Sequence, residues 1–261
     1  MHRQPIKKYI NHFLFVVLLG LIIFAFWSLD YSNLANLRLN DLANMVKGLA
    51  NPDWTYVYDR SGEDLVYLMF ETVAIAFYGT ILGAFLSIPF ILLASDVVWG
   101  NWRWIPMIGR LILNILRSVP ALIYAILFVR IVGPGAFAGA LALGIQLIGM
   151  LGKLVSEELD RSDEVPVEAM RASGASAFQS FQYARIPQVI AMSASHVINH
   201  FEINVRSATT LGLVGAGGIG APVIFALQQR NWGRVSIILL AIILVVICID
   251  LLSTQIRQLM K

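Results

Sequence analysis

Long apolar runs constrain this chain more than any other feature of its sequence. Each run approaches the length of about 20 apolar residues that a helix needs to cross a bilayer. The runs lie at 13–27, 66–95, 112–132, 137–155, 189–213 and 235–252. The sequence therefore predicts an all-α polytopic integral membrane protein with about six transmembrane helices.

The composition supports a membrane protein and excludes several other classes. Hydrophobic residues make up 58% of the chain and charged residues 13%, whereas a soluble domain carries roughly 25% charged residues. The net charge is +3 and the basic residues lie between the apolar runs, so no nucleic-acid partner is expected. The single cysteine, Cys248, excludes an internal disulfide and a CxxC site.

The distribution of Lys and Arg predicts the orientation. Arg3, Lys7 and Lys8 precede the first run, and no small-x-small cleavage site follows it, so we expect a retained first helix. With the N-terminus inside, the cytoplasmic segments hold most of the basic residues. We therefore expect an inner-membrane, multi-pass protein with both termini in the cytoplasm. We expect 1–64 to be the first helix plus an external loop with one short amphipathic piece, and 65–261 to be the core transmembrane domain.

The longest polar cytoplasmic segment runs from Lys153 to Pro187, and it predicts two short helices around a glycine. Pro166 suits the first turn of a helix. Gly174 can adopt a positive φ and end that helix. We expect the second helix to end before Pro187. Such a surface helix could dock in a groove on a partner; an ordinary interhelical loop is the alternative.

Three ionisable residues, Arg117, Glu202 and Arg206, fall within the predicted spans. Such residues usually face a bundle interior or a water-filled path. Glu202 and Arg206 are spaced i, i+4 and can pair on one helix face. One interpretation is a structural ion pair. The other is an electropositive pathway for an anion, with Asn199 lining the same face.

Several motifs of enzymes and nucleotide-binding sites are absent, or lack the neighbouring elements and residues that such a site needs. The segment 215–220 fits G-x-G-x-x-G, but it follows a predicted span and no acidic residue occurs about 20 residues later. Close backbone packing or a re-entrant turn is the better interpretation. No Walker A motif is present, and His196 and His200 lack the Glu of H-E-x-x-H. We therefore expect no catalytic residue, no metal site and no enzyme activity.

Glu168-Ala169, followed by Gly174 and then by Ile186-Pro187, resembles the EAA loop of ABC importer permeases. In that family the loop forms a coupling helix that sits in a cleft of the ATPase subunit. The family often has a second Ala at the position of Met170 and Leu at the position of Ile186. The resemblance implies a coupling loop at about 156–187. Its implied contacts with the ATPase are Glu168, Ala169, Met170, Arg171, Gly174 and Ala175.

Further stretches, at 117–139, 149–157 and 201–220, resemble permeases of phosphonate importers. The Phe-Glu-x-Asn-Val-Arg core at 201–206 favours this branch over methionine importers, which share part of the pattern. The charges and the resemblance together place one set of residues in the translocation pathway or gate. These are Arg117, Ser118, Pro120, Asn199, Glu202, Asn204, Arg206 and Thr209.

The resemblance implies a type I ABC importer permease fold. It also implies a second copy of the chain, a cytoplasmic ATPase dimer that binds ATP and Mg, an external solute-binding protein, and no cofactor in this chain. The implied substrate is a phosphonate, or a phosphite-like or phosphate-like oxyanion. The alternatives are a permease for another small solute such as methionine, a secondary transporter using Glu202 or Asp250, and an intramembrane enzyme using Glu202 or the histidines.

Overall fold

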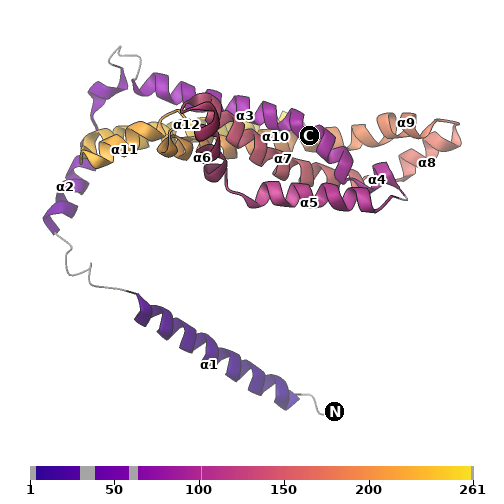
Figure 1. Ribbon diagram of the computed structural model, residues 1–261, viewed down its shortest axis with the longest axis horizontal. Coiled ribbons are helices and arrows are strands. Elements are labelled where there is room, and N and C mark those ends of the chain that lie inside the picture. Colours follow the sequence, from indigo (N-terminus) through magenta and orange to yellow (C-terminus); the bar gives the residue numbers. More distant parts are fainter. Residues whose placement is uncertain (1–3, 30–38, 59–63, 101, 260–261) are drawn as a thin grey trace. The chain divides into compact units, whose positions relative to one another are not determined.

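The computed structural model describes residues 4–29, 39–58, 64–100 and 102–259, and every regular element in these ranges is helical (Figure 1). The predicted all-α fold is confirmed. Contacts divide the chain into two compact units, Met1–Lys47 and Gly48–Lys261.

The first unit contains α1 (Gln4–Ser28) and most of α2 (Leu39–Ala50). The apolar side chains from Phe13 to Trp27 in α1 are exposed on every side of the helix. A helix that is apolar all round suits a membrane or a buried position. α2 is the short amphipathic helix predicted within the external loop, while residues 30–38 and 59–63 of that loop lie outside the described residues.

The second unit is a bundle of helices joined by short turns. Its elements are η2 (Trp54–Val57), α3 (Leu65–Ala94), α4 (Asp96–Trp99), α5 (Trp104–Ser118), α6 (Ala121–Val132), α7 (Ala136–Asp160), α8 (Val165–Ala172), α9 (Ala177–Ser180), η3 (Phe181–Arg185), α10 (Ile186–Leu211), η4 (Gly212–Val214), α11 (Gly220–Gln228) and α12 (Trp232–Leu259). α8 and α9 lie at one end of this unit and α11 at the other (Figure 1). The predicted cytoplasmic and external segments are thus at opposite ends of the bundle.

Three described helices, α3, α7 and α12, are long and apolar enough to cross a membrane, and the bent pair α5–α6 passes the same test as one span. α10, of 26 residues, matches the span predicted at 189–213 in length, and α1, of 25 residues, contains the shorter span predicted at 13–27. α10 is more polar than the others because it carries two histidines, Glu202 and Arg206. The helices of the structure therefore correspond one to one with the predicted spans.

The span predicted at 112–132 is not continuous, because α5 and α6 meet at an angle of 84°. Val119 has φ −91° and ψ 122°, the extended conformation that a following proline favours. Pro120 lacks the N–H that would continue the helix. The hydroxyl of Tyr124 donates to the carbonyl of Leu116 at 3.0 Å and so satisfies one of the backbone groups released at the break.

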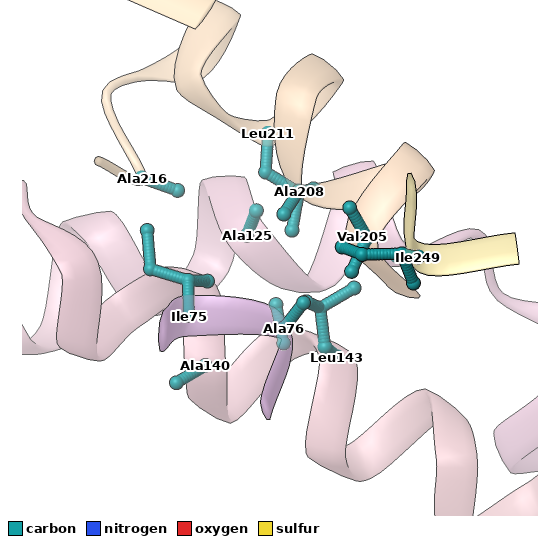
Figure 2. Close-up of a cluster of buried hydrophobic side chains, with 12 residues drawn as sticks. Ile75, Ala76, Ala125, Ala140, Leu143, Val205, Ala208, Leu211, Ala216 and Ile249 are labelled. Carbon is teal, nitrogen blue, oxygen red and sulfur yellow. The ribbon is translucent and has the colours of Figure 1, made fainter. Parts of the chain in front are cut away.

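The core of the second unit is built on the contact between α3 and α7, the most extensive between any two helices. Gly83 faces Gly144 so closely that a Cβ atom on Gly83 would lie 2.6 Å from the Gly144 carbonyl oxygen. Small residues allow this approach, as is common between membrane helices. Figure 2 shows the adjoining cluster, where Ile75 and Leu143 of these helices meet Val205 of α10.

The compact unit begins at Gly48, earlier than the predicted domain boundary at residue 64, because residues 48–57 pack on α12. The Ser236 hydroxyl donates to the Leu49 carbonyl at 2.7 Å, and the Asp53 N–H donates to the Gly233 carbonyl at 3.0 Å. Tyr56 is buried in a cluster with residues of α3 and α12. Part of the predicted external loop thus belongs to the core bundle.

We expect Gly83→Val to destabilise the protein by about 1–3 kcal/mol, because the added side chain would force α3 away from α7. The matched control is Ala74→Val on the exposed face of the same helix. Thermal unfolding of both variants in detergent measures the effect. Equal midpoints for the two variants would show that α3 and α7 do not approach as closely as described.

Candidate functional site

The predicted helix–glycine–helix segment is present at the end of the bundle. α8 has Pro166 in its first turn and ends at Ala172. Gly174 has φ +85°, a conformation that favours glycine. The N–H of Ser173 donates to the Ala169 carbonyl at 3.1 Å, and the N–H of Ala175 donates to the Met170 carbonyl at 3.1 Å. These bonds satisfy carbonyls that the end of α8 would otherwise leave free.

α8 presents nearly all of its side chains to the outside. Val167 is the one buried side chain of this helix, and it anchors α8 to the bundle. The residues predicted to contact an ATPase are half-buried or exposed: Glu168, Ala169, Met170, Arg171, Gly174 and Ala175. They belong to α8 and the turn that follows it, at the end of the unit where α8 and α9 lie (Figure 1).

The second helix of the segment does not end before Pro187, contrary to the prediction. α9 begins with a capping box between Ser176 and Gln179 and passes through the π-turn η3 directly into α10. The N–H of Ile186 donates to the carbonyl of Phe181, five residues earlier. The wider turn accommodates Pro187 in the first turn of α10, so the proline does not interrupt the helix.

Arg185, a residue that the sequence analysis did not single out, fixes the start of the coupling segment. Its guanidinium is buried and donates to the Ser162 hydroxyl at 2.8 Å and to the Glu164 carboxylate at 2.5 Å. The hydrogen bond from Arg185 is the main cause that lowers the pKa of Glu164 below its usual value. No sequence motif predicts the contact of Arg185 with the linker. The only indication in the sequence is an arginine directly before an apolar helical run.

A second polar network joins the ends of α3, α5 and α7. Asp160 accepts hydrogen bonds from the Ser95 hydroxyl at 2.6 Å and from the Val97 N–H at 3.2 Å. Arg110 bridges Asp160, at 2.9 Å, and Asp96. This network fixes the C-terminal end of α7, directly before the linker to α8.

The predicted pair of Glu202 and Arg206 is formed, with an N–O distance of 3.1 Å. Arg257 of α12 adds a third charge, because its guanidinium lies 3.9 Å from the Glu202 carboxylate and donates to the Asn199 amide oxygen at 3.4 Å. The sequence analysis did not predict this contact of Arg257. Two guanidinium groups thus flank one carboxylate, and the Arg206 side chain remains 59% exposed.

The other predicted pathway residues do not join this cluster. Asn204 is buried and donates to the Thr80 hydroxyl at 2.9 Å, which ties α10 to α3. The hydroxyls of Ser118 and Thr209 donate to carbonyls of their own helices. Arg117 is exposed beside the break at Pro120. Within the described ranges, no hydrogen bond or ion pair joins Arg117 to Glu202. The role of all these residues in a pathway stays a prediction.

The two histidines of α10 do not form a metal site. His196 pairs with Glu158 of α7 at 2.7 Å, whereas His200 is buried in the bundle. In the part of the chain that the structure describes, no group of three or more His, Cys, Asp or Glu side chains could hold a metal ion.

The glycine-rich segment at 215–220, for which close backbone packing or a re-entrant turn was expected, packs closely against α3. The N–H of Ile219 donates to the buried Thr72 hydroxyl at 2.9 Å. A Cβ atom on Gly218, which has φ +73°, would lie 2.6 Å from that same oxygen. Protein atoms therefore occupy the space that a nucleotide phosphate would need.

Two grooves run along the bundle, and both are apolar. One, of about 340 Å³, lies between α3, α7 and the start of α10. The other, of about 830 Å³, lies between η2, α3 and α12. Because their linings are almost entirely hydrocarbon, neither groove suits an anionic solute.

Known proteins share both the sequence and the fold. The model of the family "binding-protein-dependent transport system inner membrane component" matches residues 87–261. The phosphite transport system permease protein PtxC of Stutzerimonas stutzeri is 35% identical over 93% of this chain and 86% of its own length. The phosphate-import permease protein PhnE of Mycolicibacterium smegmatis is 34% identical over 74% of this chain, which covers 36% of that protein.

A solved structure has the same fold. The inward-facing MetNI methionine ABC transporter, in its native crystal form, aligns with a TM-score of 0.64 and 22% identity over 76% of this chain and 96% of the matched chain. With the family match over two thirds of the chain and the identity to PtxC over nearly all of it, the chain belongs to the family of binding-protein-dependent transport system inner membrane components.

Proposed function

We propose that this chain is the transmembrane permease subunit of an ABC importer for phosphonate, phosphite or a phosphate-like oxyanion. The observation that carries the proposal is the identity to a phosphite permease over 93% of the chain, which includes the exposed α8 segment. The likeness to the methionine transporter is 22% identical and concerns the fold alone. Methionine is therefore the weaker candidate substrate.

In this proposal the chain performs no chemistry. Two copies form the membrane pathway, an ATPase dimer in the cytoplasm binds ATP and Mg, and an external binding protein delivers the solute. α8 rests in a cleft of the ATPase, and the closure of that dimer moves α8. Since α9, η3 and α10 are continuous, the motion reaches the Glu202 cluster along α10. Alternating exposure of the pathway to the two sides then follows.

The charges around Glu202 favour an anion over a cation. Arg206 and Arg257 both lie beside the carboxylate, so the local charge is positive. An ion-coupled transporter would need a carboxylate free to bind a proton or a cation, and Glu202 is already paired. Asp250, the other candidate for such a site, is exposed on α12.

The placement of α8 and α11 at opposite ends of the second unit agrees with an orientation in which α8 is cytoplasmic and α11 is external (Figure 1). The basic residues favour the same orientation.

The proposal is tested by purifying the chain in detergent from its native membrane and identifying the proteins that accompany it. We expect an ABC ATPase, with hydrolysis that rises when the binding protein is added with phosphite or methylphosphonate. A stable complex without an ATPase would refute the proposal and favour the ion-coupled alternative. Stimulation by methionine but not by either oxyanion would refute the substrate class alone.

We expect Gly174→Val to uncouple ATP hydrolysis from transport. The open space around Gly174 would accept a side chain, but φ +85° is unfavourable for valine, so the turn after α8 must change. The matched control is Gly100→Val, since Gly100 also has a positive φ and open surroundings but lies outside the coupling segment. Uptake by membrane vesicles at fixed ATP measures the loss. Equal uptake by the two variants would contradict a coupling role for this turn.

We expect Arg206→Gln to lower oxyanion import roughly tenfold, because the pathway loses an exposed positive charge. Assembly with the ATPase, measured by co-purification, should remain. Arg103→Gln removes a charge of equal size from an exposed position away from the cluster and should import normally. Wild-type import by Arg206→Gln would show that this side chain only packs the helices.

A further inference from the structure

Arg185 is the least exposed charged residue in the described ranges, at 4% of the whole residue, so its partners decide what it does. A buried guanidinium is tolerated only when it is paired and hydrogen-bonded. Both of its side-chain partners, Ser162 and Glu164, lie in the linker between α7 and α8. Arg185 itself lies at the end of the π-turn that leads into α10. The charge pair therefore joins the linker to α10.

Gln188 makes a second connection to the same linker. Its amide oxygen accepts from the N–H of Asp163 at 2.9 Å, and its amide nitrogen donates to the carbonyl of Asp163 at 3.2 Å. The same amide nitrogen lies 2.8 Å from the Ala184 carbonyl of its own helix, which orients the side chain. One turn of helix, 185–188, thus holds three consecutive linker residues, 162–164.

The end of α7 is held by different partners. Asp160 is bonded to Ser95, to the N–H of Val97 and to Arg110, all outside α8–α10. Contacts with α10 begin two residues later, at Ser162, whose hydroxyl accepts from Arg185 and itself donates to the Leu159 carbonyl of α7 at 2.8 Å. Arg161 is the residue between the two sets of contacts, and its side chain is exposed.

An apolar groove opens beside the interface between these two bodies. The 340 Å³ groove is lined on one side by α3 and by Leu151 and Val155 of α7, and on the other by Phe181 of η3 and Val189 of α10. Across this interface, the pair of Glu158 and His196 is a polar contact. An apolar, partly open interface permits small sliding motions of packed helices.

We infer that Arg185 and Gln188 are positioning residues that clamp the linker 162–164 to the start of α10. α8 and the first turns of α10 then move as one rigid body that pivots at Arg161 against the ends of α3 and α7, while Asn204 keeps the later part of α10 tied to Thr80 of α3. The functional role of this movement rests on the proposed function, since α8 is the proposed contact with the ATPase. Arg185 touches neither ATP nor solute and acts through the orientation of α8.

The clamp is measured first in the permease alone, which needs no partner. Spin labels are attached to Ala172→Cys in α8 and Met192→Cys in α10, after Cys248→Ser, and labelled chains are diluted with unlabelled ones. We expect a narrow distance distribution that Arg185→Gln broadens and Arg185→Lys partly restores. Arg161→Gln, which removes a neighbouring exposed arginine, should leave it narrow. A distribution in Arg185→Gln as narrow as in the wild type would overturn the inference.

If Arg185→Gln fails to fold, a variant of Glu164, the exposed partner of Arg185, replaces it. The Glu164 side chain is 57% exposed, so Glu164→Gln removes the charge pair without emptying a buried site. It should broaden the same distribution, and an unchanged distribution would again overturn the clamp. The pKa of Glu164 is lowered mainly by Arg185, so the wild-type distribution should broaden as acid protonates this carboxylate.

The complex with the ATPase then tests the movement. On going from the nucleotide-free to the ATP-bound state, the Ala172–Met192 distance should stay fixed, while a distance from Ala172→Cys to Leu111→Cys in α5 should change. Glu164→Gln should lower the phosphite imported per ATP hydrolysed roughly tenfold. If the distance within α8–α10 changes instead, the rigid-body inference fails while the proposed function stands. If no ATPase binds, the proposed function fails while the spin-label result on the permease alone still decides the clamp.

Discussion

The close contact of α3 with α7 is the constraint on which the rest of the second unit depends. Lipid offers no hydrophobic gain for bringing two apolar helices together, so the association relies on contact between the helices themselves. Gly83 and Gly144 allow the backbones to approach, and α5, α6, α10 and α12 pack on this pair. α10 joins it through the buried bond from Asn204 to Thr80. The position of α10, and of the charges that it carries, therefore follows from two glycines far from them in sequence.

The polar side chains of the bundle separate two tasks. Buried bonds such as that of Thr72 with the Ile219 N–H hold turns and helices in fixed places. Exposed charges, of which Arg206 is the clearest, would be the ones to meet a solute in the proposed pathway, since Arg206 stays 59% exposed although it pairs with Glu202. An anion pathway needs both, since an unpaired cation within a bilayer is costly unless the surrounding helices keep it at a water-filled path.

Much of the fold could be predicted from the sequence, because membrane spans are defined by length and apolarity. The helix ending near Gly174 and the pairing of Glu202 with Arg206 were also predictable, since both depend on spacing within one segment. The break at Pro120 was visible as a proline, but its angle depends on packing. The contacts of Arg185 and Arg257 were not predictable, because each joins helices whose relative register no local pattern encodes.

The hydrogen bonds that hold the predicted coupling segment join residues that are close together in the sequence. Arg185 lies 21 and 23 residues from its partners, whereas Asn204 lies 124 residues from Thr80, and Ile219 lies 147 residues from Thr72. Closing a short loop costs less entropy than closing a long one. During synthesis, the segment from Ser162 to Gln188 can therefore acquire its shape as a local unit before the distant helices meet. In a nascent permease, the segment proposed to contact the ATPase would then be folded before the membrane bundle is assembled.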